Sequence, residues 1–255
     1  MSAAETRKLK IIVLGALSAI GEATARTFAA ERASLLLAGR DNDRLSQVAR
    51  DLQARGAEKV VPWPVDLAAV DDKASEIERM VAALGGTVDA VLLFYGVLGD
   101  QREAESNANE LRKLISVNFA SAAEWCVASG GVLERQKSGV LLVIGSVAGD
   151  RGRQSNYIYG SAKAGLAVLV EGLAHRLAPI GARAVVVKLG FVDTPMTAHL
   201  NKTGPLWAKP AEVARILKRI VERPSAPVVY VPWFWRPIMT IVRNVPTALF
   251  HRTKL

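Results

Sequence analysis

Apolar residues along the chain gather in short runs, and longer segments with apolar positions every three or four residues lie between them. Short runs bounded by turn residues are typical of buried strands, and the longer spacing is typical of helices. We expect strands near 10–14, 34–38, 59–63, 88–94, 139–145, 183–189 and 228–231. We expect helices near 20–32, 42–55, 69–84, 102–135, 156–178 and 210–222. Strands that alternate with helices pair in parallel, so the predicted fold class is α/β, a doubly wound parallel sheet with helices on both faces.

The end of the chain differs from the rest. We assign 1–232 to one α/β domain, since 255 residues can bury a sizeable core, and 233–255 to a basic amphipathic tail. Pro246 would interrupt a helix in this tail. Apolar residues recur there at helical spacing, with basic residues between them: Ile238, Ile241, Val242, Val245, Leu249 and Phe250, and then Arg243, Arg252 and Lys254.

A glycine-rich turn follows the first predicted strand. Gly15 would permit the tight turn, and Gly21 would allow the next helix to pack closely on the strand. Backbone N–H groups at such a helix N-terminus face a pyrophosphate, and Ser18 and Ile20 fall in the same segment. We therefore interpret the turn as a nucleotide-binding loop. An ordinary turn between a strand and a helix is the alternative.

Ser146, Tyr159 and Lys163 carry candidate proton-transfer chemistry. Tyr159 and Lys163 stand four residues apart, so both side chains lie on one face of a helix, whereas Tyr157 has Ser161 at that spacing. A free tyrosine has a pKa near ~10, and an adjacent ammonium lowers that pKa. Such a pair can exchange a proton with the oxygen of a ketone or an alcohol, to which Ser146 can hydrogen bond. A helix that merely carries a tyrosine and a lysine one turn apart is the alternative.

These motifs, in this order, resemble the short-chain dehydrogenase/reductase family from 9 to 231. The matching positions are Gly15, Gly21, Asn118, Ser146, Tyr159 and Lys163. The resemblance implies a Rossmann-type fold and NAD(P)H-dependent interconversion of a ketone and a secondary alcohol. It implies that Tyr159 exchanges the proton, that Lys163 also holds the nicotinamide ribose, and that Asn118 helps to hold a water near Lys163. The chain departs from the family's usual sequence at Leu14, Ala19, Leu93, Phe94 and Tyr95.

The end of the second predicted strand indicates which cofactor binds. An acidic residue there would favour NAD, but Gly39 occupies the place and Arg40 follows, and an arginine can pair with a 2′-phosphate. We therefore expect NADP(H), with NAD(H) as the second possibility. A solvated Arg40 beside Asp41 as a helix N-cap is the alternative. By the resemblance, Asp66 contacts the adenine, Val192 and Thr194 hold the nicotinamide carboxamide, and the cofactor site also includes Leu67 and Gly96.

Arg151 and Arg153 lie in the loop before the helix of Tyr159, where we expect the rim of the substrate pocket. Two guanidinium groups there can bind an anionic substrate such as a phosphate. Ion pairing with Asp150 or with another subunit is the alternative. The segment 195–209 would form a mobile lid.

The net charge of +9 is unusual for a soluble oxidoreductase, and no nucleic-acid-binding motif accompanies it. The segment 223–255 holds five Lys/Arg residues and no acid, which favours an anionic membrane surface as a partner. We expect Trp233, Trp235, Ile238 and Ile241 to enter that interface. Packing of the tail against the protein's own core, or against a neighbouring subunit, is the alternative.

A narrower resemblance concerns the substrate. The segments 96–100, 149–151 and 196–200, together with the basic tail, look like the branch of the family that reduces a decaprenylphosphoryl-linked 2-keto pentose at the inner face of the bacterial membrane. This implies a polyprenyl-phosphate-linked ketone. A cytosolic reductase of a small ketone or a 3-oxoacyl thioester is the alternative, and a non-catalytic nucleotide-binding sensor is a third reading. The family also implies a homodimer or homotetramer, in which the helices 102–135 and 156–178 pair across a two-fold axis.

The sequence predicts neither a disulfide nor a metal site. Cys126 is the single cysteine, and the three histidines, His175, His199 and His251, lack the spacing of metal ligands. We see no signal peptide and no apolar segment of the ~18–20 residues that span a bilayer. We therefore expect a cytoplasmic protein, either free or at the inner membrane surface.

Overall fold

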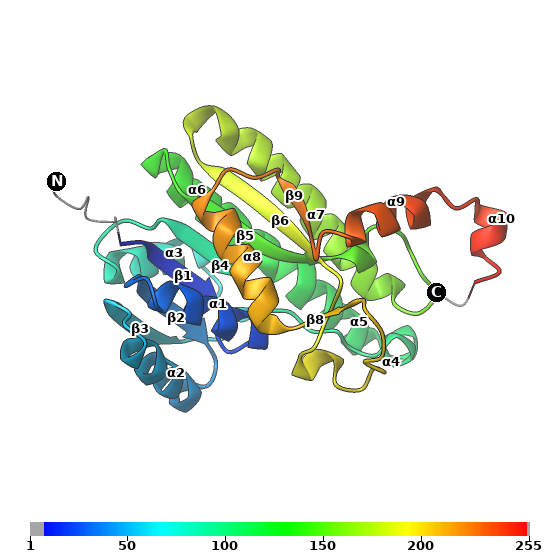
Figure 1. The fold of residues 1–255 in the computed structure, drawn as a ribbon, viewed down its shortest axis with the longest axis horizontal. Helices are drawn as coiled ribbons and strands as arrows, with labels where there is room; N and C mark the ends of the chain where they lie inside the picture. Colours follow the sequence, from blue (N-terminus) through cyan, green and yellow to red (C-terminus); the bar gives the residue numbers. More distant parts are fainter. Residues whose placement is uncertain (1–7, 254–255) are drawn as a thin grey trace.

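Seven parallel strands form one sheet in the order β3-β2-β1-β4-β5-β6-β9 (Figure 1). The strands are β1 (Lys10–Leu14), β2 (Ser34–Gly39), β3 (Lys59–Pro64), β4 (Ala90–Leu93), β5 (Val140–Ser146), β6 (Arg183–Leu189) and β9 (Val228–Val231). A separate parallel pair consists of β7 (Phe191–Val192) and β8 (Trp207–Ala208), which the sequence did not predict. The structure, a computed structural model, describes residues 8–253. It confirms the α/β fold class and all seven predicted strands.

Helices cover both faces of the sheet (Figure 1). One face carries α1 (Ala19–Ala29), α2 (Asn42–Ala54) and α8 (Pro210–Glu222), and the other carries α3 (Lys73–Ala83), α6 (Ser121–Gln136) and α7 (Tyr157–Leu177). Successive residues of β1 alternate between these layers: Ile11 and Val13 belong to the core under α1, α2 and α8, and Ile12 and Leu14 to the core under α3, α6 and α7. Both faces of the sheet are buried, which explains why the apolar runs in the sequence are continuous.

The predicted continuous helix over 102–135 is wrong. The structure has α4 (Gln101–Ser106), α5 (Ala108–Ile115), a π-helical turn (Ser116–Ala120) and then α6. Asn107 breaks the segment because its backbone is extended, at φ −122° and ψ 103°, and its side chain accepts a hydrogen bond from the Asn109 N–H at 3.0 Å. The helix predicted from 69 likewise begins only at Lys73, since Asp72 caps it through the Ser75 N–H.

The strand order reverses at β1. β2 and β3 lie on one side of β1, and β4, β5, β6 and β9 lie on the other. Ligands of such sheets bind beyond the carboxyl ends of the strands, at the point of reversal. The predicted positions at or just beyond strand ends are Gly15, Gly39, Asp66, Gly96, Ser146 and Gly190. These positions therefore share one edge of the sheet.

The tail after β9 forms two short helices, α9 (Trp235–Asn244) and α10 (Thr247–Phe250), with Pro246 between them as expected. They lie beyond the carboxyl end of the sheet, at the right of Figure 1. No helix among residues 8–253 is long and apolar enough to cross a membrane. Lys254, which the sequence counts among the basic residues of the tail, lies outside the described residues.

One side of the tail packs on the domain. Trp235 and Met239 are buried against Val147, and Ile238 packs against the same cluster. The expectation that Trp235 enters a membrane is therefore wrong, because the protein's own side chains cover it, and Ile238 is partly covered by the same cluster. Trp233 is 77% exposed, so the tail keeps an outward apolar side as well as a buried one.

Candidate active site

The glycine-rich turn joins β1 to α1, and close contacts require its glycines. Gly15 has a φ of +87°, and a Cβ there would come within 2.6 Å of the Tyr95 backbone nitrogen. A Cβ on Gly21 would come within 2.9 Å of the Gly15 carbonyl oxygen. Ser18 caps α1 by accepting a hydrogen bond from the Gly21 N–H at 3.0 Å, and Ile20 follows, half-buried. The turn is thus closely packed, with a glycine at each end, and the N-terminus of α1 points its backbone N–H groups toward a pyrophosphate cradle.

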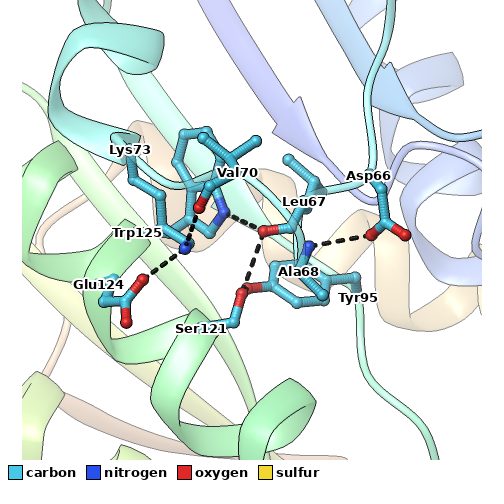
Figure 2. A network of polar contacts seen from close by, with 9 residues as sticks. All are labelled: Asp66, Leu67, Ala68, Val70, Lys73, Tyr95, Ser121, Glu124 and Trp125. Atoms are coloured by element: carbon cyan, nitrogen blue, oxygen red, sulfur yellow. Dashed lines mark hydrogen bonds and ion pairs between the residues drawn. The ribbon is translucent and has the colours of Figure 1, made fainter.

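A polar network ties the end of β3 to α6 on the side where an adenine would lie (Figure 2). The Leu67 carbonyl accepts hydrogen bonds from Ser121 Oγ at 3.0 Å and Trp125 Nε1 at 2.8 Å. Tyr95 Oη lies 2.8 Å from the same Ser121 Oγ. Burial raises the pKa of Tyr95, so its hydroxyl stays neutral. The network fixes Leu67, a predicted cofactor-site residue, and Tyr95, which departs from the family's usual sequence and precedes Gly96.

Asp66 lies just outside this network. Its carboxylate accepts a hydrogen bond from the Ala68 N–H at 3.0 Å, which holds the turn after β3, and the side chain is exposed (Figure 2). The nearby ammonium of Lys73, which is almost fully buried, donates to the Val70 carbonyl at 2.7 Å and pairs with Glu124 instead of Asp66. The exposed carboxylate of Asp66 therefore remains available to an adenine amino group.

Arg40 follows β2 at the same edge. Its side chain is exposed and forms no hydrogen bond or ion pair with the described residues. Asp41 caps α2 by accepting a hydrogen bond from the Arg44 N–H at 3.0 Å. The structure thus shows the features of the alternative, an exposed Arg40 beside Asp41 as the N-cap; the Arg40 guanidinium is nevertheless free to meet a 2′-phosphate, and that contact stays a prediction.

The predicted nicotinamide end lies beyond β6. Val192 is buried in β7, and its carbonyl accepts a hydrogen bond from Thr197 Oγ1 at 2.7 Å. The Thr194 N–H donates to the same Thr197 Oγ1 at 3.2 Å, which closes a short helical turn over Pro195–Thr197. The cradle at Gly15 and this turn lie at one edge of the sheet, so the residues present fit an extended dinucleotide.

Tyr159 and Lys163 occupy the first turns of α7 and face the end of β5. Lys163 Nζ donates to the Ile144 carbonyl at 3.1 Å and lies 5.8 Å from the centroid of the Tyr159 ring. Lys163 is 4% exposed. Ser146 ends β5, and its Oγ accepts a hydrogen bond from the Ala148 N–H at 3.1 Å. The structure thus brings together the three predicted proton-transfer groups.

The electrostatics of this trio differ from the expectation. Burial raises the pKa of Tyr159 to about 12, and a hydrogen bond with Ser146 acts in the opposite direction. Burial also lowers the pKa of Lys163 to about 8. In the protein without cofactor burial therefore raises the pKa of Tyr159, in the direction opposite to the expected lowering by Lys163. Tyr159 is a neutral phenol at pH 7 and is suited to donate a proton.

Tyr157 points away from this trio. Its side chain is 46% exposed, and its Oη donates to Glu105 Oε1 at 3.0 Å. That hydrogen bond raises the pKa of Tyr157. The structure therefore separates the two tyrosines of α7 as their spacing predicts, with Tyr159 beside the lysine.

Asn118 lies in the π-helical turn before α6 and is fully buried. Its Oδ1 accepts from the Val97 N–H at 3.1 Å, and its Nδ2 donates to the carbonyls of Val97 at 2.8 Å and Leu114 at 3.0 Å. A Cβ on Gly96 would come within 2.7 Å of Asn118 Oδ1 and 3.5 Å of Lys163 Nζ. The Asn118 amide therefore positions the loop after β4 against Lys163; its part in holding a water stays a prediction.

The two arginines expected at the substrate have separate surroundings. Arg151 Nη1 donates to the carbonyls of Val242 at 2.5 Å and Val245 at 2.7 Å, at the end of α9. Arg153 Nη2 donates to the Val147 carbonyl at 3.0 Å. Arg151 would have to release the tail to bind a substrate, whereas Arg153 lies beside the residue that follows Ser146. Substrate binding by either stays a prediction.

Sequence reasoning missed a buried charge network next to this loop. Lys188 Nζ donates to Asp150 Oδ1 at 2.5 Å, and Tyr230 Oη donates to Asp150 Oδ2 at 2.8 Å. Burial, followed by the bond to Asp150, raises the pKa of Tyr230 to about 12. The available signal was Lys188 itself, because a charge inside an apolar strand requires a partner.

Comparisons with known proteins agree with this geometry. Residues 9–204 match the family model described as short chain dehydrogenase. An uncharacterized oxidoreductase of Streptomyces coelicolor is 36% identical over 244 residues, which cover 95% of this chain and 94% of that protein. It is similar to this chain over nearly the full length of both.

Two solved structures share the fold. An alcohol dehydrogenase from the archaeon Thermococcus sibiricus, complexed with 5-hydroxy-NADP, is 26% identical, with a TM-score of 0.75 over 88% of this chain and 95% of its own. A short-chain dehydrogenase from Sphingobium yanoikuyae, in complex with NADPH, is 22% identical, with a TM-score of 0.78 over 94% of this chain and 97% of its own.

Replacing Tyr159 should remove turnover without removing cofactor binding. Loss of a general acid costs roughly 10²–10⁴ in rate, so we expect Tyr159→Phe to lower kcat by at least two orders of magnitude. Its dissociation constant for NADPH, measured by fluorescence titration, should change little. Tyr157→Phe is the matched control. Full turnover by Tyr159→Phe with loss in Tyr157→Phe would show that the assignment is wrong.

Replacing Arg40 should discriminate between the two cofactors. Losing a charge-assisted hydrogen bond costs on the order of 1.5–3 kcal/mol, or roughly ten- to hundredfold in affinity. We expect Arg40→Ala to weaken NADPH by that factor and to leave NADH nearly unchanged in calorimetric titrations. Arg44→Ala, a neighbouring exposed arginine, should change neither. Equal affinities of the wild type for NADPH and NADH would contradict this prediction.

Proposed function

Since the chain belongs to the short-chain dehydrogenase/reductase family and is an NAD(P)-dependent oxidoreductase, we propose that it reduces a ketone to a secondary alcohol with NADPH. The observation that supports this function is the placement of the Tyr159 hydroxyl beside Ser146, with the buried ammonium of Lys163 one turn along α7. A phenol that keeps its proton at pH 7 can protonate the oxygen of a ketone.

The side chains divide the chemistry of reduction among them. A nicotinamide bound by these residues would supply the hydride for the carbonyl carbon. Ser146 Oγ donates a hydrogen bond to the carbonyl oxygen, and the Tyr159 hydroxyl gives that oxygen its proton. Lys163, charged below a pKa of about 8, stabilises the phenolate that remains. Asn118 and Gly96 hold the loop after β4 in the position that lets Lys163 approach.

We further propose an anionic ketone as the substrate, such as a polyprenyl-phosphate-linked 2-keto pentose. Arg153 supports this. Its guanidinium is half-buried, its Nε has no hydrogen-bond partner among the described residues, and it forms no ion pair with them. Burial lowers the pKa of Arg153, and the charge of Asp150 acts in the opposite direction. Asp150 is already bonded to Lys188 and Tyr230, so the half-buried guanidinium with its unpaired Nε favours an anionic ligand. Arg153 also adjoins the residue after Ser146.

A kinetic panel tests this function. NADPH oxidation would be followed with small neutral ketones, a 3-oxoacyl thioester, a phosphorylated keto pentose and its polyprenyl-linked form. We expect Arg153→Gln to raise KM for the phosphorylated ketone roughly ten- to hundredfold, from the loss of a charged hydrogen bond, and to spare neutral ketones. Arg151→Gln, the matched control, should affect charged and neutral ketones alike. If only the small neutral ketones or only the thioester are turned over, the anionic substrate is wrong and that alternative substrate takes its place. If no ketone is turned over, a non-catalytic nucleotide-binding sensor is favoured.

Exposed apolar residues on the outer surfaces of α5, α6 and α7 favour a homodimer or homotetramer. Val168 is 70% exposed and Val127 is 52% exposed, and Leu111 and Tyr157 are exposed nearby on α5 and α7. A mostly apolar cavity of about 520 Å³ opens between α5 and α7 beside Leu111 and Tyr157. We propose that a second copy of the chain covers this surface, because a two-fold interface matches one such patch with itself.

A charge in that patch should separate the subunits. Each buried valine contributes ~1.5–3 kcal/mol, and a two-fold axis doubles the loss. We expect Val168→Glu to weaken the dimer at least roughly hundredfold in sedimentation equilibrium. Ile241→Glu, at an equally exposed site on α9, should leave the assembly intact. A wild-type protein that sediments as a monomer at micromolar concentration would overturn the proposal.

The outward side of the tail supports contact with an anionic membrane. Trp233 and Ile241 are exposed there, and Arg236 and Arg243 are exposed beside them. Aromatic and aliphatic side chains enter the interfacial region, and each basic residue adds about 1 kcal/mol at an anionic surface. We propose that this side places the active site at the inner membrane surface, where a polyprenyl-linked substrate would be found.

Flotation with vesicles tests the membrane contact. The protein should float with phosphatidylserine-rich vesicles at low salt and should not float with phosphatidylcholine alone. We expect Arg236→Gln with Arg243→Gln to remove ~2 kcal/mol of binding, roughly thirtyfold. The same charge change at Arg44 and Arg50, on α2, is the control. Failure of the wild type to float with anionic vesicles would leave a soluble ketone as the substrate.

A further inference from the structure

The indole of Trp235 lies directly on Gly190, the residue that follows β6. A Cβ on Gly190 would come within 1.8 Å of Trp235 Nε1 and 2.0 Å of Cε2, so only glycine permits this contact. The side chain is 4% exposed. The first residue of α9 thus reaches the carboxyl edge of the sheet, where the substrate site must open.

Aromatic rings and the turn after β5 enclose this indole. Phe191 meets Trp235 edge to face at 5.3 Å between ring centroids and stacks on Trp207 at 5.1 Å. Trp207 lies near the end of the segment 195–209 predicted to form the lid, and Phe191 leads into Val192 of the predicted cofactor site. Trp235 also belongs to the buried apolar cluster of Val147, the residue next to Ser146. The indole is therefore connected through Phe191 to the predicted lid and through Val147 to the turn after Ser146.

The loop between Ser146 and Tyr159 holds α9 in this place. The guanidinium of Arg151 donates to the free carbonyls at the end of α9 and lies 3.7 Å from the centroid of the Phe250 ring. Gln154 Nε2 donates to the Thr253 carbonyl at 3.3 Å. Such contacts satisfy helix-terminal carbonyls that would otherwise lack partners. Helix α9 is therefore held at both ends, at its start by the contacts of Trp235 and at its end by the hydrogen bonds from Arg151.

One polar atom in this arrangement lacks a partner. Trp235 Nε1 is buried and forms no hydrogen bond with any residue between 8 and 253. Buried donors in folded proteins are nearly always paired, and an unpaired one beside a functional site is accounted for when a ligand or a water supplies the acceptor. An indole N–H is a donor only, so the missing partner must be an acceptor such as an oxygen.

We propose that Trp235 determines substrate specificity: its ring forms a wall of the substrate site, and its N–H donates to an oxygen substituent of the bound ketone. This deepens the proposed ketone reduction and rests on it. A site built to hydrogen bond a substrate hydroxyl rejects the analogue that lacks it, since the donor is then left unpaired. The protein is therefore a reductase of hydroxylated ketones, and its tail is part of the active site.

A pair of ketones tests this inference: 2-hydroxycyclohexanone and cyclohexanone. The wild type should show at least tenfold higher kcat/KM for the hydroxylated ketone. Trp235→Phe, which keeps a ring and removes the N–H, should lose that tenfold preference through KM, with the NADPH dissociation constant unchanged. Trp63→Phe is the control, because the Trp63 N–H already donates to Glu76 at 2.7 Å.

The outcomes separate the two proposals. If the wild type has equal kcat/KM for both ketones, the role of Trp235 is overturned. This test needs no variant, so it applies even if Trp235→Phe does not fold. A loss in Trp235→Phe that is equal for both ketones, or that appears in NADPH affinity, also overturns it. Turnover of neither ketone, nor of any ketone in the wider panel, contradicts the proposed function itself.

Discussion

Three segments of the chain meet around the ammonium of Lys163, and the active site depends on this meeting. The Ile144 carbonyl of β5 accepts its hydrogen bond, the loop at Gly96 passes beside it, and Asn118 clamps that loop. A buried charge is unfavourable unless it is hydrogen bonded, and here burial lowers the lysine pKa to about 8. A side chain at Gly96 would strike Asn118, so the approach exists only because that position is glycine.

The same constraint places Tyr159 one turn earlier on α7. The turn after β5 presses closely on this helix: a Cβ on Gly149 would come within 2.8 Å of the Ala164 nitrogen, and one on Gly160 within 2.7 Å of the Ala148 carbonyl oxygen. Desolvation on this side of α7 raises the pKa of the Tyr159 phenol. The neutral Tyr159 hydroxyl and the buried Lys163 ammonium thus both result from packing, without any contribution from charges at the surface. The tail extends this framework, because Arg151 fixes α9 from the loop between these elements.

Much of this structure was readable from the sequence, for identifiable reasons. Apolar runs that are buried on both faces gave the seven strands, and the spacing of Tyr159 and Lys163 gave the face of α7. The break at Asn107 was missed because apolar periodicity continues across it, while its extended backbone depends on a local cap. The hydrogen bonds from Arg151 to the tail were also not predicted, because they join residues that are distant in sequence. An amphipathic pattern likewise cannot say whether protein or membrane covers Trp235.

The pH dependence of ketone reduction tests the central claim most directly, because it reports the charge on Lys163 while Tyr159 stays protonated. A lysine with a lowered pKa supplies its charge below that pKa and loses it above. The account predicts that kcat/KM is constant from about pH 6 to 7.5 and falls tenfold per pH unit above about 8, the pKa of Lys163. In Lys163→Arg the fall in kcat/KM should move to a pH above this range. A flat profile to pH 10, or an unchanged break in the variant, would contradict the account.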